Sequence, residues 1–523
     1  MSRKVSIFLL LIFLACNKEY DNSNLNIFRY NESSGITTLD PIYSSNQANI
    51  WAVNQLFNGL VQLDKSLKIQ PCIAKSWEIS NNAREYIFKL RNDINFHNHK
   101  EFNNGFSRVV NAFDVEYSYN RLLDKKLASP GSWVLSNVQN FSALNDSTFK
   151  IVLIKPFPAF LSLLTMQYCS IVPKEIVELG DFDKNPIGTG PFKFQIWKDG
   201  VKMVFRKNNF YFEKDSVRYL PYLDAISITF IKDKQTEFLE FIKGNLDFIS
   251  GIDVSYKDLL LTKKGNLQTK YKNIVKLQSK PYLNTEYLGF LMHKPLPIKI
   301  RKAINYGFDR SKMIKYIRNN IGTPAINGFV PLSISPHHIR LNGYNYKPEY
   351  AKKLIVQSVK EDNFDLDREI VLYTTSSYQD LCEYIQSELS KLGLNINMEV
   401  NPPSTHRQMV ATSKINFFRG SWIADYPDAE NYLSLFYSKN FSPNGPNYTH
   451  FNNKEFDYLY ENSLSIIDDK KRYLNYHKMD SIIIDNAVIV PLYYDMVLRF
   501  SNKNINNFDC NPMNLLDLKR VIK

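Results

Sequence analysis

Apolar residues recur at two different spacings along this chain, every second residue in some segments and at helical spacing in others. Segments of the two kinds alternate. Residues 74–90 alternate apolar with polar side chains, which is typical of a β-hairpin. Residues 110–123 place apolar side chains at helical spacing after Asn111, and Asp114 three positions later completes a capping-box pattern. Residues 222–249 have the pattern of a strand, a helix and a second strand. This alternation predicts an α/β fold with parallel or mixed sheets.

A segment near the C-terminal end combines a strand-like apolar pattern with two opposite charges. Residues 416–436 read NFFRGSWIADYPDAENYLSLF, so that Arg419 and Asp425 interrupt an apolar run. Buried charges are costly unless a partner neutralises them. Read as one strand through Asp425, the segment places both charges on one face and Trp422 on the other. At about 3.3 Å per residue the two charges lie roughly 20 Å apart. We therefore expect that they form no mutual salt bridge and await a ligand that carries both charges.

The N-terminal residues predict export and lipid anchoring. Arg3 and Lys4 precede an apolar stretch over residues 5–14, which is shorter than the roughly 20 residues of a membrane span and reads as a signal peptide. The letters FLAC then resemble a bacterial lipobox, in which Cys16 is lipidated and becomes the first mature residue. Residues 17–24 read as a polar tether. The alternative is an ordinary signal peptide that happens to contain a cysteine. We expect the protein to be anchored by lipid in the cell envelope, facing the periplasm or the cell exterior.

The composition is that of a long folded chain without a nucleic-acid partner. Of its 523 residues, 44% are hydrophobic and 22% are charged. These proportions supply the cores of several domains and do not predict long disordered stretches. The formal net charge is +13, but no run of five or six like charges appears. Phosphate binding needs basic residues gathered on one face, so we expect no nucleic-acid ligand.

Motifs of catalysis and of metal binding are missing from the sequence. It contains no G-x-S-x-G elbow, no H-E-x-x-H and no Gly-rich nucleotide loop, so we expect neither an enzyme nor a cofactor. We interpret His97 and His99 as part of a solvated loop, with a metal pair as the alternative. Four cysteines besides Cys16 lack metal-ligand spacing, and whether they form disulfides stays open: Cys72, Cys169, Cys382 and Cys510.

Eight segments, in order along the chain, are similar to those of one protein family. They resemble family 5 of the bacterial extracellular solute-binding proteins, which includes the oligopeptide-binding components of peptide ABC transporters. The resemblance runs over nearly the whole mature chain. The segments read TLDP, AKSWEIS with YIFKLRNDINF, NAFDVEYSYNRLL, PIGTGPFKF, LDAISITFI with GNLDFI, LPIKIRKAINYGFDRSKMI, SWIADYPDAENYLSLFYS and AVIVPLYYDMVLRF.

The resemblance implies a two-lobed periplasmic-binding-protein fold of the class II type. An extra domain accompanies the two lobes, and the ligand cleft lies between the lobes, which close by hinge motion. The implied division is a lipoprotein signal peptide over residues 1–16, a tether over 17–24, lobe I over 25–57, 187–280 and 497–523, the extra domain over 58–186, and lobe II over 281–496.

The resemblance also implies which residues bind the ligand. In the family, the Asp of the ADY motif binds the α-amino group of a peptide, and this role corresponds to Asp425. The Arg six residues earlier contributes to carboxylate recognition, which corresponds to Arg419. Gly420 is expected to let a peptide backbone approach and pair with the strand. The predicted peptide-binding residues are Asp425, Arg419, Gly420, Trp422, Ala424, Ser45, Gln47, Gln379 and Tyr494.

Several of these assignments have open alternatives. Trp422 is either a ligand contact or an ordinary core residue, and Asp425 either binds ligand or only forms the turn that follows it. Gln379 stands where some family members have a carboxylate-binding His. Tyr494 is either part of the hinge packing or a ligand contact.

The resemblance implies that this protein is the substrate-binding component of an ABC importer. We expect it to capture oligopeptides by backbone pairing and by recognition of their charged ends, to deliver them to permease subunits in the membrane, and to act as a monomer. Other ligands on the same fold are the alternative: a nickel complex, a sugar or an opine. A further alternative is a surface ligand sensor or an adhesin.

Overall fold

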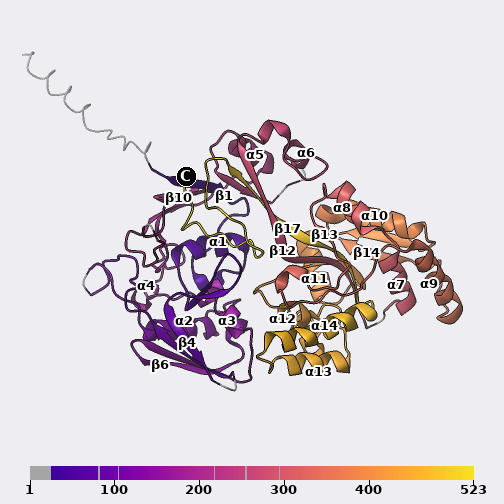
Figure 1. The fold of residues 1–523 in the computed structure, drawn as a ribbon, viewed down its shortest axis with the longest axis horizontal. Helices are drawn as coiled ribbons and strands as arrows, with labels where there is room; N and C mark the ends of the chain where they lie inside the picture. Colours follow the sequence, from indigo (N-terminus) through magenta and orange to yellow (C-terminus); the bar gives the residue numbers. More distant parts are fainter. Residues whose placement is uncertain are drawn as a thin grey trace, which may run out of the picture.

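The structure is a computed structural model that describes residues 25–523 except 81–82, 104, 217, 252, 254–255 and 294. Cys16 and the predicted tether lie outside these residues. The described chain forms two lobes, one from segments coloured indigo to magenta, to which the yellow C-terminal end returns, and one from segments coloured orange to yellow (Figure 1). The predicted two-lobed α/β fold is thus confirmed.

Strands and helices alternate along most of the described chain, as the hydrophobic pattern predicts. The strands are β1 Ile27–Asn31, β2 Val61–Leu63, β3 Ile69–Pro71, β4 Ala74–Ile79, β5 Glu85–Leu90, β6 Val138–Asn145, β7 Thr148–Leu153, β8 Phe192–Lys198, β9 Lys202–Lys207, β10 Ala225–Thr229, β11 Phe248–Ser250, β12 Val275–Phe290, β13 Thr323–Pro324, β14 Ile370–Thr374, β15 Ile396–Val400, β16 Phe417–Ile423 and β17 Ile489–Asn502. The α-helices are α1 Gln47–Leu56, α2 Ala112–Leu123, α3 Phe160–Leu163, α4 Lys174–Val177, α5 Lys234–Ile242, α6 Lys257–Leu260, α7 Ile298–Tyr306, α8 Arg310–Ile317, α9 Pro348–Glu361, α10 Gln379–Ser390, α11 Pro403–Ala411, α12 Glu430–Leu433, α13 Lys454–Ser463 and α14 Asp469–Asp485.

One mixed sheet of 11 strands runs through both lobes. Its strand order is β15-β14-β16-β12-β17-β11-β1-β10-β9-β8, and β13 pairs with β17. The two longest strands, β12 and β17, have 16 and 14 residues and pair antiparallel where the lobes meet (Figure 1). Their ladder is irregular between Pro281 and Thr285, close to the predicted lobe border after residue 280. These paired strands are therefore the connection on which a hinge between the lobes would act.

Local signals in the sequence placed several elements correctly. The capping box of α2 forms in both directions: Asn111 Oδ1 accepts from Asp114 N at 3.2 Å, and Asp114 Oδ2 accepts from Asn111 N at 2.9 Å. The strand-helix-strand unit over residues 222–249 also forms, because β10 and β11 are joined through α5 and both pair parallel to β1. Gly244, at φ +83°, lies just after α5 in the left-handed conformation that ends many helices.

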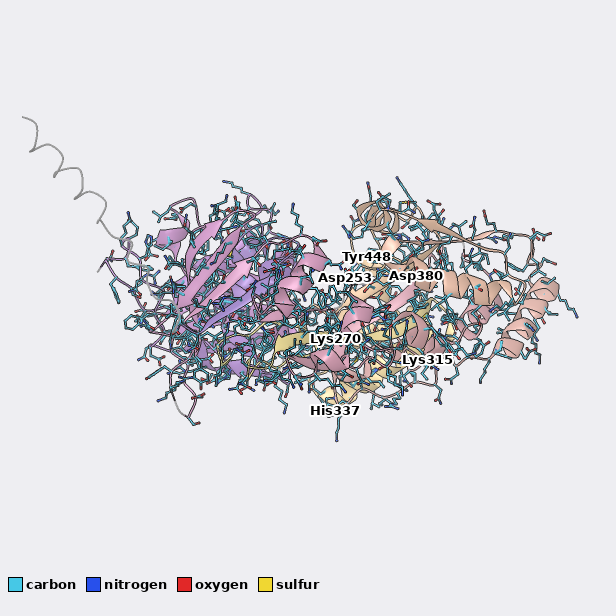
Figure 2. All side chains as sticks on the ribbon, turned by 90° about the horizontal axis from the view of Figure 1, so that it is seen from above. Asp253, Lys270, Lys315, His337, Asp380 and Tyr448 are labelled. Carbon is cyan, nitrogen blue, oxygen red and sulfur yellow. The ribbon has the colours of Figure 1, made fainter. Side chains whose placement is uncertain are left out.

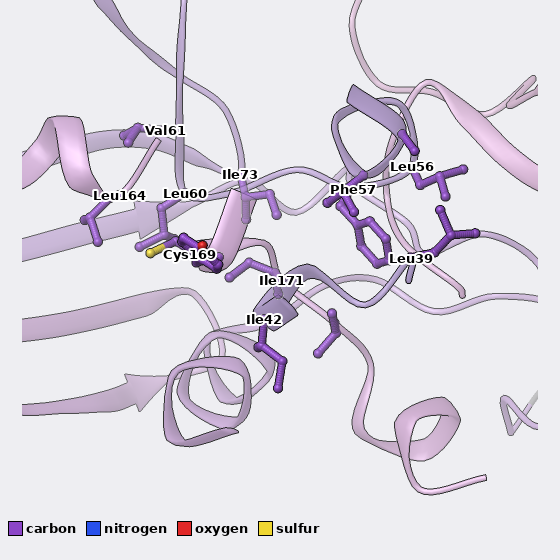
Figure 3. Packing of buried hydrophobic residues seen from close by; sticks show 14 of the residues in the cluster. Leu39, Ile42, Leu56, Phe57, Leu60, Val61, Ile73, Leu164, Cys169 and Ile171 are labelled. Atoms are coloured by element: carbon purple, nitrogen blue, oxygen red, sulfur yellow. The ribbon is translucent and has the colours of Figure 1, made fainter. Parts of the chain in front are cut away.

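The predicted extra domain contains a four-stranded antiparallel sheet of order β4-β5-β7-β6, against which α2 packs. Its core is continuous with that of lobe I. Figure 3 shows Leu56 and Phe57, at the end of α1, in one cluster with Ile73 and Ile171. The border expected after residue 57 thus crosses one continuous cluster of buried side chains, and the predicted division into domains stays a prediction.

His97 does not lie in a solvated loop, and that interpretation is wrong. Its side chain is 2% exposed, and its ring is hydrogen-bonded to the backbone of Gly188 and Gly190 at 3.3 and 3.0 Å. Burial lowers the pKa of His97 to about 4, so the ring is neutral and bridges the two backbone groups. Both glycines press against the end of α1, where a Cβ atom would lie 2.1 to 2.3 Å from the backbone of Leu56.

The described residues contain no helix that is both long and apolar enough to cross a membrane. The four cysteines at positions 72, 169, 382 and 510 are buried and free, so they form no disulfide with one another.

Candidate ligand-binding site

A cavity of about 1040 Å³ lies between lobe II, the extra domain and the start of α1. One wall comes from the end of β16 and the turn and helix that follow it. The opposite wall comes from segments of the extra domain within residues 133–168. Five of the predicted site residues line this cavity: Ser45, Gln47, Trp422, Ala424 and Asp425.

Asp425 presents its carboxylate to the cavity without a cationic partner. Within the described part of the chain it accepts one long hydrogen bond, 3.4 Å from Asn431 Nδ2, and no lysine, arginine or histidine pairs with it. The residue is exposed to solvent in the cleft, but the surrounding protein still desolvates its carboxylate enough to raise the pKa of Asp425. Burial, together with the charge of Asp425, raises the pKa of Tyr168 in the extra domain to about 12. A ligand ammonium group at this point would stabilise the ionised carboxylate.

Asn431, the second residue of α12, holds Asp425 and Trp422 in place. Its amide oxygen accepts hydrogen bonds from Trp422 Nε1 at 2.9 Å and from the backbone N–H of Asp425 at 3.2 Å. The side chain of Asn431 is itself buried, at 4% exposure. Trp422 is half-buried: it packs against the core of lobe II and also lines the cavity.

The strand that carries Arg419 is shorter than predicted, and this changes the geometry of the two charges. β16 ends at Ile423, two residues before Asp425. The alternation of side chains between the two faces of the strand stops there. Asp425 and Trp422 are both hydrogen-bonded to the side chain of Asn431, whereas Arg419 lies against Glu286. The two charges form no ion pair with each other, as expected, but the prediction that they share one face is wrong.

Arg419 has a partner inside the protein. One of its Nη atoms pairs with an Oε atom of Glu286, and the two side chains are 13% and 2% exposed. The guanidinium carbon also lies 3.3 Å from the ring centre of Tyr378. Burial disfavours the charge, but Glu286 and its neighbours hold the pKa of Arg419 above its usual value. The expectation that Arg419 waits unpaired for a ligand is therefore wrong, because a ligand carboxylate must compete with Glu286.

Glu286 was not predicted as part of the site, although the sequence carries a signal for it. It is the one charged residue within residues 281–292, an otherwise apolar and polar-neutral run, just as Arg419 interrupts β16. In the antiparallel pairing of β12 with β16, Glu286 lies opposite Ser421. Arg419 is two residues from Ser421 on the same face, so it reaches Glu286 diagonally.

The second edge of β16 is free where the strand approaches the cavity. Along one edge β16 pairs with β12 over its full length, but along the other only Phe418 pairs, with Tyr373 of β14. The edge from Gly420 to Ile423 has no second partner strand among the described residues. Gly420 itself makes room for the ring of Tyr287, since a Cβ atom would lie 2.5 Å from that ring. The close approach that Gly420 permits is therefore internal and not that of a ligand backbone.

Two other predicted residues lie outside the main cavity. Gln379 begins α10, and its amide donates to Glu383 at 2.8 Å. Tyr494 is buried at 7% exposure, and its hydroxyl donates to the backbone oxygen of Gly328 at 2.8 Å. The position of Tyr494 favours the hinge-packing alternative, since it lies on β17 beside β12 and β13.

A second cavity, of about 480 Å³, continues from the first, because Gln47 and Tyr282 line both. Its arginine, Arg318, pairs with Asp495 at 2.6 Å. Asp380 also lines this cavity and is labelled near the middle of the molecule in Figure 2. The two cavities together form a cleft that runs between the lobes.

A second carboxylate, Glu430 at the start of α12, also lines the main cavity. It is 4% exposed, and the hydroxyls of Tyr426 and Tyr460 each donate to one of its oxygens. Desolvation raises the pKa of Glu430 to about 7. No sequence motif had singled out this residue, because the tyrosine of α13 reaches it only in the folded chain.

The chain is similar to known proteins over most of its length. The sequence pattern described as "Bacterial extracellular solute-binding proteins, family 5 Middle" matches residues 68–444. Heme-binding protein A of Haemophilus influenzae is 28% identical over 467 residues, which are 84% of this chain and 82% of that protein. Dipeptide-binding protein DppE of Bacillus subtilis is 25% identical over 540 residues, with 95% and 92% of the two chains covered.

A solved structure has the same fold. The periplasmic binding protein DppA from Helicobacter pylori, in complex with the peptide STSA, superposes with a TM-score of 0.78 at 24% identity. The match covers 95% of this chain and 97% of that chain. Together with the matched pattern over residues 68–444, these findings show that the chain belongs to family 5 of the bacterial extracellular solute-binding proteins.

Proposed function

We propose that this protein is the substrate-binding component of an ABC importer and that it captures oligopeptides in the cavity around Asp425. The observation that carries the proposal is the carboxylate of Asp425, which faces a large cavity and has no cationic partner in the described chain. The α-amino group of a peptide supplies such a partner. Hydrogen bonds to charged groups of this kind contribute about 1.5–3 kcal/mol each.

The free edge of β16 supports a peptide as the ligand. An extended peptide can pair its N–H and C=O groups with an open strand edge, and this pairing does not depend on the peptide sequence. Gln47, the first residue of α1, and Ser45, just before the helix, face the same cavity and offer further polar contacts. One relative is named for dipeptides, and one related structure holds a peptide.

The two arginines that could bind the carboxylate end of the peptide already have partners, which leaves Lys155 as the cation of the main cavity. Arg419 is paired with Glu286, and Arg318 is paired with Asp495. We therefore propose that the amino end contributes most of the end recognition. Arg419 can bind the carboxylate end only while it also stays paired with Glu286. A role for Gln379, beside the second cavity, stays a proposal.

Heme is the alternative raised by the relative named for it. The main cavity is large and has many aromatic walls, but its charged lining residues are two carboxylates, Asp425 and Glu430, and one ammonium group, Lys155. Heme carries two carboxylates of its own. Like charges brought together in a partly desolvated cavity repel strongly. The balance of charge therefore favours a ligand with a cationic end.

We expect the purified protein to bind short peptides that have a free amino terminus, and to retain peptides from the cells in which it is made. Calorimetry with trialanine and mass spectrometry of extracted ligands measure the two effects. Hemin, a nickel–histidine complex, a sugar and an opine are the comparison ligands. If one of these binds and no peptide does, the proposed function is wrong.

Delivery to an importer requires partners and a location. We propose that the monomeric protein passes its ligand to the permease subunits of an ABC transporter. We also propose that lipid on Cys16 holds it at the membrane, with the residues up to position 24 acting as a tether. A sensor or adhesin role would leave ligand binding intact but would not require the permease.

We expect Cys16→Ser to release the protein from the membrane fraction, because the variant loses the proposed lipid and residues 25–523, as far as the structure describes them, contain no membrane-spanning helix. Cell fractionation and labelling with a fatty-acid analogue measure the effect. Cys72→Ser is the matched control and should leave both readouts unchanged. A parent protein that takes up no label, or a Cys16→Ser variant that stays membrane-bound, would show that the anchor is not on this residue.

A further inference from the structure

We propose that the main cavity contains a cation subsite, formed by Glu430, Tyr426, Tyr437, Tyr460 and Trp133, for the side chain of a peptide's first residue. This inference rests on the proposed peptide-binding function and deepens it. It names the class of peptide that binds best, namely peptides that begin with lysine or arginine.

The walls of the cation subsite are aromatic. Tyr437 and Tyr460 stack with ring centres 4.5 Å apart, and Trp133 of the extra domain lies 6.4 Å from the ring of Tyr426. All four rings line the main cavity. Ammonium and guanidinium groups are attracted to such rings by about 0.5–2 kcal/mol. The ring of Trp133 comes from the opposite wall, so a bound side chain would be enclosed from both sides.

The carboxylate of Glu430 supplies the negative charge behind these rings. Two tyrosine hydroxyls donate to its two separate oxygens, an arrangement that suits the ionised carboxylate. Two cations lie close by and have other partners: Arg472 pairs with Asp428 and Asp469, and Lys439, 5.7 Å from the ring centre of Tyr437, pairs with Glu461. Desolvation with no cationic partner in the described chain raises the pKa of Glu430 to about 7. A ligand cation would stabilise its ionised form.

The position of the cation subsite matches the first residue of a peptide held at Asp425. Glu430 is followed directly by Asn431, whose side chain contacts Asp425. Both residues line the main cavity, so the two carboxylates belong to the same wall. A peptide whose α-amino group is at Asp425 would direct its first side chain toward Glu430 and the surrounding rings.

The one lining residue of opposite sign does not neutralise Glu430. Lys155 lies on the extra domain and is not among the groups that shift the pKa of Glu430. The pKa of Glu461 is lowered mainly by hydrogen bonds from Lys439 and Tyr437, and only slightly by the charge of Lys155. A peptide that begins with an acidic residue would add a third carboxylate close to Asp425 and Glu430, which is unfavourable.

The test compares four tripeptides by calorimetry on the full protein: Lys-Ala-Ala, norleucine-Ala-Ala, Glu-Ala-Ala and Ala-Ala-Lys. Norleucine has the apolar stem of lysine without its charge. We expect Lys-Ala-Ala to bind at least about tenfold more tightly than norleucine-Ala-Ala, and Glu-Ala-Ala to bind weakest. Ala-Ala-Lys should bind like the norleucine peptide, because its charge is at the wrong end.

Two variants assign the preference to the cation subsite. Glu430→Gln keeps the size of the side chain and removes its charge, so the preference for lysine over norleucine should fall below about threefold. Glu455→Gln makes the same change at an exposed position of α13 and should keep the full preference. Trp133→Leu alters an exposed ring on the opposite wall, at 41% exposure, and should reduce the preference even if Glu430→Gln does not fold.

The outcomes separate this inference from the proposed function. Equal binding of the lysine and norleucine peptides to the parent protein overturns the cation subsite and leaves peptide binding intact. Full preference retained in both Glu430→Gln and Trp133→Leu also overturns it. Failure of all four peptides to bind instead overturns the proposed function, and the cation subsite with it.

Discussion

Arg419→Ala is expected to destabilise the protein by about 3–5 kcal/mol, the usual cost of removing one partner of a buried ion pair. The change leaves Glu286, whose side chain is 2% exposed, without its cation. It also removes the guanidinium group that lies against the ring of Tyr378. Urea unfolding followed by tryptophan fluorescence measures the loss as a lower midpoint.

Two further variants test whether the loss comes from the uncompensated charge. Arg407→Ala removes an exposed arginine from α11 and should change stability by less than about 0.5 kcal/mol. The double variant Glu286→Gln, Arg419→Met removes both charges and should recover much of the stability. If Arg419→Ala unfolds at the same urea concentration as the parent and binds amidated and free peptides alike, Arg419 is a ligand contact that awaits the peptide.

Asp425→Asn is expected to weaken the binding of peptides with a free amino terminus by at least tenfold. Truncating one partner of a desolvated charge pair costs on the order of 2–5 kcal/mol, and each factor of ten corresponds to about 1.4 kcal/mol. Asparagine keeps the size of the side chain and its contact with Asn431. Calorimetry with a free and an N-acetylated form of one peptide gives a double-mutant cycle.

The cycle should be strongly non-additive, because acetylation and Asp425→Asn remove two partners of one interaction. Acetylation should weaken binding to the parent protein but scarcely affect the variant. Asp380→Asn makes the same chemical change in the second cavity and should keep the effect of acetylation at its parental size. Additive losses at Asp425 would mean that this carboxylate does not contact the amino end of the peptide.

Local features of the fold were accessible to prediction because neighbouring residues decide them. The capping box of Asn111 and Asp114 depends on groups three positions apart. The order of strands and helices follows from the period of the apolar residues. The two-lobed arrangement was predictable only through the family resemblance, since the pairing of β12 with β17 joins segments about two hundred residues apart.

The candidate site was likewise only partly predictable from the sequence. The ADY motif identified Asp425, and Ser45, Gln47, Trp422 and Ala424 all line one cavity with it. The partners of these residues were not predicted. Asn431 binds Asp425 across the turn that ends β16, and a strand extrapolated through that turn assigned Asp425 to the wrong face.

By itself, the sequence determined the elements, the family and a residue that presents a carboxylate to the main cavity, because each of these depends on the order of nearby side chains. Tertiary structure decided which charges are free. In the sequence, Arg419 and Asp425 look alike, as single charges in an apolar run. In the structure, Arg419 pairs with Glu286, 133 residues away on β12, whereas no cation of the described chain pairs with Asp425. Whether a charge in an apolar run has a partner depends on the strand register and on the position of the turn that ends the strand. These are set by packing over the whole sheet, which no single stretch of sequence encodes.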